Sequence, residues 1–436
     1  MVLWRLQSFG AGCSFFLAHP VSYTFRFRST QERPRHGWPR MSFSPHVTLN
    51  QRAFILICAL GAMAETLLFT AVAPMLETLD AEFGLSAAWA GLLVAGYAIG
   101  YWFGAYPAYR CAARLGSRMT ATVGVGCVAS ASFAFAVGDS FSELMVARLL
   151  IGFGSVATYT GLLGAVEKLE GQETSGRAIG FIYTGSVVGS AFGPFLGSLS
   201  VTFGREPVFL ALAVGQVIVA TLVFCLPSVP NSAHVSVRAM SRYLNSREVG
   251  VGLWICSLPG FALGILTVAG TYRLVSLGTS PHSIALAFSG IALIGVFLTP
   301  QIGKWSDRVG RRRPTLLALG LSLIAMVLIF VTDATLANIG LIAIAGAGIS
   351  AVAGPGLALV GDAIRERGGD STQATFLMNL CWGPAAALGA ILAGQFHGGW
   401  GGKGALLMLS LIVTISILTV RMNIGEVSRS SSVREE

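Results

Sequence analysis

The sequence predicts an all-α membrane protein in which twelve transmembrane helices form two pseudo-repeated bundles of six. Three observations predict this fold: the composition, a series of apolar runs of membrane-spanning length, and basic residues that gather in every second connection. Of the 436 residues, 54% are apolar and 11% are charged. Soluble domains carry roughly a quarter charged residues, so the composition excludes a soluble multidomain enzyme and a disordered scaffold. A β-barrel is excluded as well, because it would alternate apolar and polar residues in segments of about ten.

The apolar runs have the length that a membrane requires. A bilayer core about 30 Å thick needs roughly 20 apolar residues in a helix. Spans one to six are predicted at 54–76, 87–108, 120–137, 144–166, 178–201 and 208–226. Spans seven to twelve are predicted at 249–269, 284–302, 315–331, 336–360, 374–396 and 405–420.

The basic residues predict how the chain is oriented. Fifteen Lys and Arg lie in the connections that follow spans two, four, six, eight and ten, and three lie in the opposite set. Short cytoplasmic loops retain basic residues, so both termini are expected in the cytoplasm. These loops account for much of the formal charge of +9, and nucleic acid is therefore not an expected partner.

Two landmarks recur at nearly the same separation along the chain. Gly116 follows span two as Gly310 follows span eight, and glycine precedes both Pro194 in span five and Pro384 in span eleven. The recurrence predicts a six-helix unit duplicated in parallel orientation, as in transporters that rock two halves around a central site. The expected organisation is a first bundle at 53–227, a cytoplasmic linker at 228–248, a second bundle at 249–422 and a cytoplasmic tail at 423–436.

Residues 1–52 form a basic tail without a span. The first 50 or so residues hold six arginines against the single acid Glu32. We expect a disordered tail, or upstream sequence read through to a second start at Met41. A targeting peptide is the alternative, because such leaders are rich in arginine and poor in acids.

The cysteines and histidines do not predict a metal or redox site. Five of the seven cysteines stand alone in apolar runs, where they act as small hydrophobic residues: Cys58, Cys127, Cys225, Cys256 and Cys381. The six histidines lack the spacing of zinc or haem ligands. No metal and no cofactor are expected, and the expected partners of a monomer are a small-molecule substrate, protons and the lipid bilayer.

The loop between spans eight and nine reads Gly-Lys-Trp-Ser-Asp-Arg-Val-Gly-Arg-Arg. Its glycines permit a tight turn, its Asp can face a helix N-terminus, and its arginines hold the cytoplasmic surface. The loop resembles the signature of the major facilitator superfamily, which implies the major facilitator fold and a gating role. The residues concerned are Gly303, Asp307, Arg308, Gly310 and Arg311. The matching loop after span two has Ala113 at the Asp position, so the second loop is expected to dominate. A plain basic loop with one salt bridge is the alternative.

One acid and one base are predicted at similar depth inside the first bundle. Arg148 lies well inside span four and opens a glycine-containing run that also resembles a motif of the superfamily. A guanidinium inside a bilayer needs a partner or water, and Glu65 is the only acid predicted within the spans. A rise of about 1.5 Å per residue places Arg148 roughly 9 Å and Glu65 about 12 Å from the outer edge. We expect Glu65 to be the protonatable site and to pair with Arg148, its modulator; a static ion pair is the alternative.

Span five has a small residue at every fourth position, which puts a smooth stripe on one helix face. The run resembles the signature of the drug:proton antiporter branch, and its continuation is similar to vesicular amine transporters and bacterial multidrug exporters. The gating residues implied here are Gly189, Gly193, Pro194 and Gly197; helix packing alone is the alternative. Vesicular amine transporters carry further acids in spans ten and eleven, whereas this chain has only Asp362 at the cytoplasmic end of span ten.

Aromatic and polar side chains on several spans are candidates for the cavity wall, because aromatic faces suit flat or cationic compounds. Aromatic residues also pack helices and sit at membrane interfaces, which is the alternative. The candidates are Tyr97, Tyr101, Trp102, Thr158, Tyr159, Tyr183, Trp254, Asn379 and Trp382.

The preferred interpretation is a secondary active transporter that exports small hydrophobic or cationic compounds, coupled to protons, by alternating access. The resemblance implies the inner (plasma) membrane of a bacterium. A proton-coupled importer or a facilitator of a small metabolite is an alternative, because fold does not fix function. A transport-inactive membrane receptor is another, suggested by Ala113. An enzyme is not expected: Lys403 follows two glycines, but Gly404 stands where a phosphate loop needs Ser or Thr.

Overall fold

The computed structural model describes residues 49–170, 175–226, 243–368, 371–397 and 403–424. Contacts divide the chain between Ala53 and Phe54, and the fold below is that of the second unit. Most of the predicted N-terminal tail, most of the linker and nearly all of the C-terminal tail lie outside the described residues.

The described residues of the first half are helical. Their elements are α1 (Leu49–Thr70), the 3-10 helix η2 (Ala73–Met75), α2 (Leu76–Phe83), α3 (Ala87–Val137), α4 (Phe141–Glu170), α5 (Ser175–Phe203) and α6 (Arg205–Phe224). The second half contains a π-helix, a wider turn often found at functional positions. The elements of the second half are α8 (Arg247–Ile265), the π-helix η4 (Leu266–Gly270), α9 (Thr271–Ser276), α10 (Pro281–Val309), α11 (Arg312–Val331), α12 (Thr335–Ala351), α13 (Ala353–Arg365), α14 (Ser371–Gln395) and α15 (Lys403–Asn423).

The helices account for all twelve predicted spans. Among the described residues, eleven helical segments are long and apolar enough to cross a membrane. The longest, Ala87–Val137, contains both span two and span three. The two spans meet at Gly116, where the backbone leaves the helical region. The prediction of an all-α membrane protein is confirmed. Helix α8 begins at Arg247, before predicted span seven, and Ser246 caps it by accepting a hydrogen bond from the amide of Val249.

The two turns of the predicted repeat share one backbone conformation. Gly116 has φ 81° and ψ 169°, and Gly310 has φ 88° and ψ 164°. This region is essentially restricted to glycine, because a Cβ atom clashes there with the backbone. The requirement for one unusual turn at equivalent places explains why glycine recurs in both halves.

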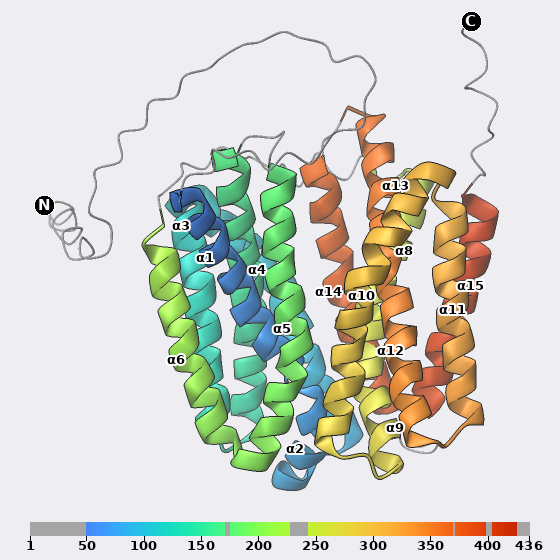
Figure 1. Ribbon diagram of the computed structural model, residues 1–436, viewed down its shortest axis with the longest axis horizontal. Helices are drawn as coiled ribbons and strands as arrows, with labels where there is room; N and C mark the ends of the chain where they lie inside the picture. Colours follow the sequence, from blue (N-terminus) through green and yellow to red (C-terminus); the bar gives the residue numbers. More distant parts are fainter. Residues whose placement is uncertain (1–48, 171–174, 227–242, 369–370, 398–402, 425–436) are drawn as a thin grey trace, which may run out of the picture. The chain divides into compact units, whose positions relative to one another are not determined.

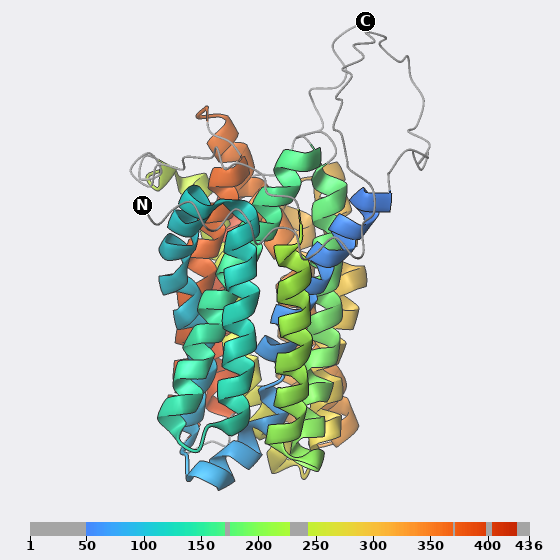
Figure 2. The same ribbon diagram turned by 90° about the vertical axis from the view of Figure 1, so that its left-hand side faces the viewer.

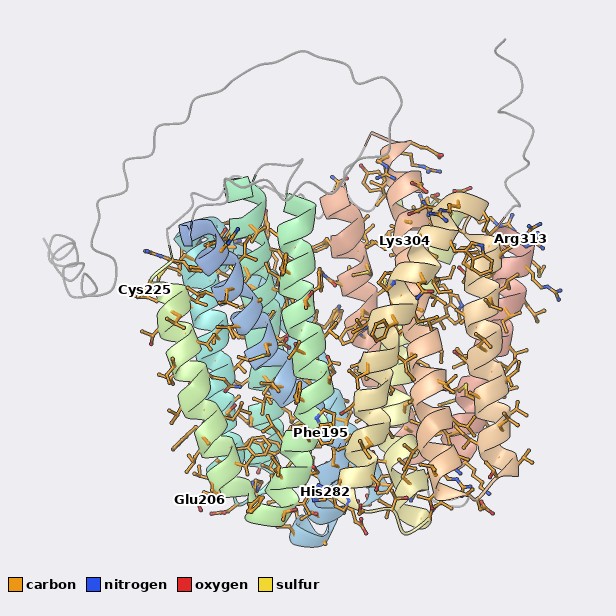
Figure 3. The ribbon with its side chains drawn as sticks, viewed as in Figure 1. Phe195, Glu206, Cys225, His282, Lys304 and Arg313 are labelled. Atoms are coloured by element: carbon orange, nitrogen blue, oxygen red, sulfur yellow. The ribbon has the colours of Figure 1, made fainter. Side chains whose placement is uncertain are left out.

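The two halves lie side by side within residues 54–436. Helices α1 to α6 form one group and α8 to α15 the other, as Figures 1 and 2 show from two directions. The most extensive contacts between the groups are those of α3 with α14 and of α5 with α10. Figure 3 labels Lys304 and Arg313 at one end of the helices and Glu206 and His282 at the other. We call these the basic end and the opposite end.

Glycines allow close contact between α3 and α4, most closely at Gly100 and Gly152. A Cβ atom on Gly100 would lie 2.0 Å from the carbonyl oxygen of Leu149, and one on Gly152 would lie 2.0 Å from that of Tyr97. Backbones approach this closely only where side chains are missing. The contact holds Tyr97 of α3 against the middle of α4.

Gly100→Ala should therefore separate α3 from α4. Overpacking of this kind costs about 1–3 kcal/mol, so we expect a lower midpoint of thermal unfolding for the purified protein in detergent. Gly126→Ala is the matched control, because a Cβ at Gly126 meets nothing within 4 Å. Equal midpoints for the two variants would show that the contact is not as close as described.

Candidate functional site

Glu65 of α1 is the centre of a hydroxyl cluster buried in the first half. The residue is 2% exposed. Its Oε1 accepts hydrogen bonds from Ser155 Oγ at 2.5 Å and Tyr97 Oη at 3.0 Å, and its Oε2 accepts one from Thr66 Oγ1 at 2.9 Å. A hydroxyl can donate to a carboxylate and can rotate to accept from a carboxylic acid. The cluster can therefore satisfy Glu65 in both protonation states.

Arg148 of α4 is also buried, 1% exposed, but it does not pair with Glu65. Its guanidinium donates to the backbone carbonyls of Leu93 (3.2 Å), Phe69 (3.3 Å) and Val94 (3.4 Å). Tyr97 lies between the acid and the base: its hydroxyl donates to Glu65, and its ring centroid is 5.8 Å from the guanidinium carbon of Arg148.

The predicted ion pair between Glu65 and Arg148 is absent, and the end of α1 explains why. Helix α1 ends at Thr70, so the carbonyl of Phe69 has no partner one turn further along the helix. That free carbonyl accepts from Arg148. Depth along the helices, which the sequence does give, brings the two side chains to one level, but it does not say what stands between them.

The small-residue stripe of α5 packs on the helix that carries Glu65. Cβ atoms added to the stripe would lie between 1.9 and 2.6 Å from carbonyl oxygens of residues 59–71. The positions are Gly185, Gly189, Gly193 and Gly197. The predicted stripe is thus a packing face for α1, and its role in gating stays a prediction, as does that of Pro194, which lies inside α5.

Sequence reasoning missed a second set of contacts around α1. Gln216 of α6 is buried, its Nε2 donates to the carbonyl of Ala64 at 3.0 Å, and its Oε1 accepts from Ser132 Oγ at 2.5 Å. These bonds hold the backbone beside Glu65. The available signal was a lone amide inside the apolar run of span six. Ser155 and Thr66 gave no comparable signal, because hydroxyl residues are common inside apolar helices.

Four predicted cavity residues form two aromatic pairs. Tyr101 of α3 meets Trp382 of α14 edge to face, with ring centroids 5.8 Å apart, and this pair joins the two halves. Tyr159 of α4 stacks with Tyr183 of α5 at 6.2 Å, and its hydroxyl is hydrogen-bonded to Ser186. The pairs present aromatic surface on both sides of the boundary between the halves.

Thr158 differs from the prediction of a cavity role, whereas the cavity role of Trp254 stays a prediction. Thr158 is buried against Gly124 of α3, and its hydroxyl donates to its own helix at Gly154 O. Trp254 donates its indole N–H to Ser416 of α15 at 3.0 Å, within the second half. The sequence supplied the residue type but not the helix face. Tyr97 lies at the carboxylate itself, and the cavity role of Trp102 and Asn379 stays a prediction.

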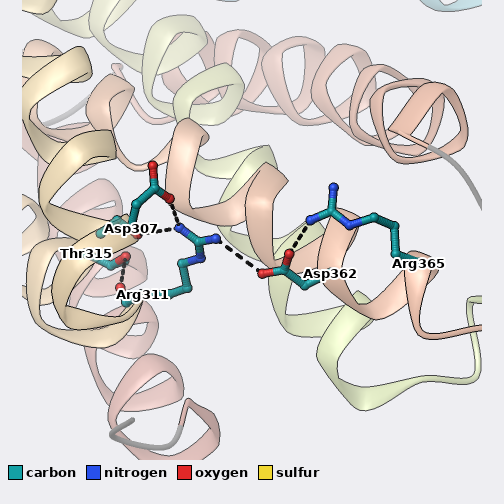
Figure 4. A network of polar contacts seen from close by, with 6 residues as sticks. Asp307, Arg311, Thr315, Asp362 and Arg365 are labelled. Carbon is teal, nitrogen blue, oxygen red and sulfur yellow. Dashed lines mark hydrogen bonds and ion pairs between the residues drawn. The ribbon is translucent and has the colours of Figure 1, made fainter. Parts of the chain in front are cut away.

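The signature loop at the basic end belongs to a chain of ion pairs, drawn in Figure 4. Arg311 pairs with Asp307 and, at 3.3 Å, with Asp362 of α13, which also pairs with Arg365. Asp307 is thus paired with the side chain of Arg311, the N-cap residue of α11. Partial burial lowers the pKa of Arg311, but its hydrogen bonds to the two aspartates outweigh burial and raise the pKa above its usual value. Gly303 and Arg308 remain predicted gating residues.

Asp362→Asn should weaken this network more than it weakens the fold. Partly exposed ion pairs contribute about 0.2–1 kcal/mol, and salt screens them. We expect a small fall in the midpoint of thermal unfolding at low salt and a smaller further fall than in the wild type when NaCl is raised to roughly 1 M, where the Debye length is about 3 Å. Asp333→Asn, which removes a pair at the opposite end, is the control. An unchanged salt response in Asp362→Asn would contradict a network centred on this residue.

The halves are joined by hydrogen bonds towards the opposite end. Tyr272 of α9 donates to Asp80 of α2, Ser289 of α10 donates to Ala191 O at 2.6 Å, and His282 lies 3.0 Å from Ser198 Oγ. Towards the basic end of the same helices, Cβ atoms on Gly180 of α5 and Gly303 of α10 would meet nothing within 4 Å.

Comparison with known proteins gives a consistent family match. The profile of the Major Facilitator Superfamily matches residues 58–272 and 253–434. The chain is 24% identical over 233 residues to the quinolone resistance protein NorA of Staphylococcus aureus (strain MRSA252), which covers 51% of this chain and 59% of that protein. It is 27% identical over 198 residues to the multidrug resistance protein MdtG of Proteus mirabilis (strain HI4320), covering 42% and 48%. The matches span about half the length of these relatives.

Two solved structures are similar in fold. One is a bacterial homolog of the human lysosomal transporter Spinster in an inward-facing, unoccupied conformation, with a TM-score of 0.68, 15% identity and coverage of 88% of this chain and 98% of that one. The other is a D-xylose–proton symporter, with a TM-score of 0.68, 16% identity and coverage of 86% and 98%. At this identity the likeness concerns the fold alone.

Proposed function

Because this chain belongs to the Major Facilitator Superfamily, a family of membrane transporters and not of enzymes, we propose that it exports small hydrophobic or cationic compounds in exchange for protons. It is a multi-pass integral membrane protein and a secondary transporter of small molecules. Export, coupling to protons and the class of cargo are the proposal. The similarity to NorA and MdtG, named for resistance to quinolones and to multiple drugs, supports that class.

The proposal depends most on the buried Glu65. Hydroxyls from three helices surround its carboxylate, and the buried cation Arg148 lies on the other side of Tyr97. With Glu65 ionised, the two charges balance. Protonation leaves the charge of Arg148 alone in an environment of low dielectric, where charges interact strongly. One proton therefore changes the net charge in the middle of the first half.

The packing of the two halves supports an alternating-access cycle. The contacts described above join the halves towards the opposite end, so we propose that cargo enters from the basic end in this state. The pairs Tyr101–Trp382 and Tyr159–Tyr183 offer flat faces to an aromatic or cationic compound. After cargo leaves on the other side, protonation of Glu65 replaces the charge that the cargo carried and favours the return.

The test is transport by the full-length protein in lipid vesicles with an imposed pH gradient. We expect a fluorescent quinolone or the lipophilic cation tetraphenylphosphonium to accumulate in vesicles with an acidic lumen, and a protonophore to abolish the accumulation. Uptake that ignores the gradient would favour a facilitator, and net movement along the proton flux would favour an importer. A protein that binds the compounds without moving them would favour a receptor. Each of these three results overturns the proposal.

A further inference from the structure

A second polar cluster, far from Glu65 in the sequence, lies where the halves meet at the opposite end. Asp80 of α2 accepts a hydrogen bond at Oδ2 from the hydroxyl of Tyr272 of α9. The other carboxylate oxygen, Oδ1, is buried and has no hydrogen-bond partner. A buried acceptor left without a donor costs about 1–3 kcal/mol, and more when the group is charged.

His397, just beyond α14, completes the cluster. Its ring lies against that of Tyr272, with centroids 4.4 Å apart, and its Nδ1 is also buried without a partner. Burial lowers the pKa of His397, which favours the neutral imidazole with one nitrogen free to accept. Tyr272 thus contacts both residues, and each of them presents one unsatisfied polar atom.

Among the described residues, no side chain is hydrogen-bonded to Asp80 Oδ1 or His397 Nδ1, and Arg273 Nε is also buried without a partner. Glu77, one turn before Asp80 on α2, adds negative charge. Arg273, beside Tyr272, is turned to Asp333 at 2.5 Å and to the carbonyl of Thr332. In the described part of the chain, η2 carries no titratable side chain, and the other charged groups at α2 are its own Glu82 and Arg205 of α6, which pair with each other at 2.8 Å. A negative site without a paired cation favours uptake of a proton.

We propose that Asp80 holds a proton when the opposite end is closed, so that closing this end takes up a proton and opening it releases the proton. A proton on Asp80 Oδ1 removes the buried charge and turns an unsatisfied acceptor into a donor. When the end opens, water solvates the carboxylate and the charged form is restored. Low pH therefore stabilises the closed end. The site does not depend on Glu65.

The test is hydrogen–deuterium exchange of the full-length protein in nanodiscs of phosphatidylethanolamine and phosphatidylglycerol. Exchange in peptides covering α2 and α9 is measured from pH 5 to 8 and corrected for the chemical rate. We expect wild-type exchange to be at least threefold slower at the acidic limit. In Asp80→Asn, whose amide can donate without titrating, exchange should be slow at every pH. Tyr272→Phe should exchange faster than wild type throughout.

A control separates this site from other acids at the opposite end. Asp139→Asn makes the same chemical change at an exposed position of that end and should keep the wild-type response. Wild-type exchange that does not change with pH, or an equal pH response in Asp80→Asn, would overturn the proposal. So would a response to replacing choline by Na⁺ at constant pH, because the missing donor would then be a metal cation and not a proton.

Discussion

Replacing Glu65 with glutamine should abolish accumulation driven by a pH gradient while leaving cargo exchange without a gradient. The amide oxygen can still accept from the hydroxyls of Ser155 and Tyr97, so the cluster keeps its shape. It cannot take up or release a proton. We expect accumulation to fall at least tenfold, to the level of wild type with a protonophore; tenfold corresponds to roughly 1.4 kcal/mol. Equilibrium exchange of labelled cargo should stay within about threefold of wild type.

The matched control is Glu366→Gln. Glu366 is exposed, just beyond α13, and its replacement should leave accumulation unchanged. If Glu65→Gln still accumulates cargo against a gradient, the proton is carried by another group and the proposed role of Glu65 is wrong. If both exchange and accumulation disappear in a variant that unfolds at the wild-type temperature, Glu65 binds cargo in place of coupling it to the proton.

Arg148→Met should abolish transport and destabilise the first half. Methionine is long enough to occupy much of the same space, but it donates no hydrogen bond to the carbonyls of Leu93, Phe69 and Val94. The carbonyl of Phe69 suffers most, because the end of α1 gives it no helical partner. One hydrogen bond from a charged group contributes about 1.5–3 kcal/mol, so the free energy of unfolding should fall by at least that amount.

The readouts for Arg148→Met are thermal unfolding and transport at a temperature where the variant is still folded. Arg421→Met, at an exposed position in the last turn of α15, should match wild type in both. Arg148→Lys distinguishes charge from shape. Lysine keeps the positive charge but has fewer N–H donors than the guanidinium, so we expect partial recovery of stability but not of transport. Full transport by Arg148→Met would show that the buried cation has only a structural role.

The spans were predictable because bilayer thickness sets their length, whatever the helices pack against. Gly116 and Gly310 were predictable for a similar reason, since each turn requires a conformation that glycine alone adopts readily. The buried positions of Glu65 and Arg148 followed from the cost of placing a charge in a membrane. In each of these cases a strong local constraint is visible in the residues themselves.

The contacts between these residues depend on helix rotation, which apolar spans with mixed faces do not specify. Tyr97 was identified as aromatic, but not as the group between the acid and the base. Asp362 was placed at the end of its span, but its pairing with Arg311 joins segments 51 residues apart. For the same reason, Thr158 was predicted to line the cavity, but it is buried against Gly124 of α3. Gln216 was passed over although a lone amide in an apolar run needs partners.

The hydroxyls that bond Glu65 all come from α1, α3 and α4, and the carbonyls that hold Arg148 come from α1 and α3. The residues proposed to couple transport to the proton therefore all lie in the first bundle, whereas Trp382 lies in the second. A chimera that keeps the first bundle and borrows the second from a relative should inherit its energy source from one parent and its preference among compounds partly from the other.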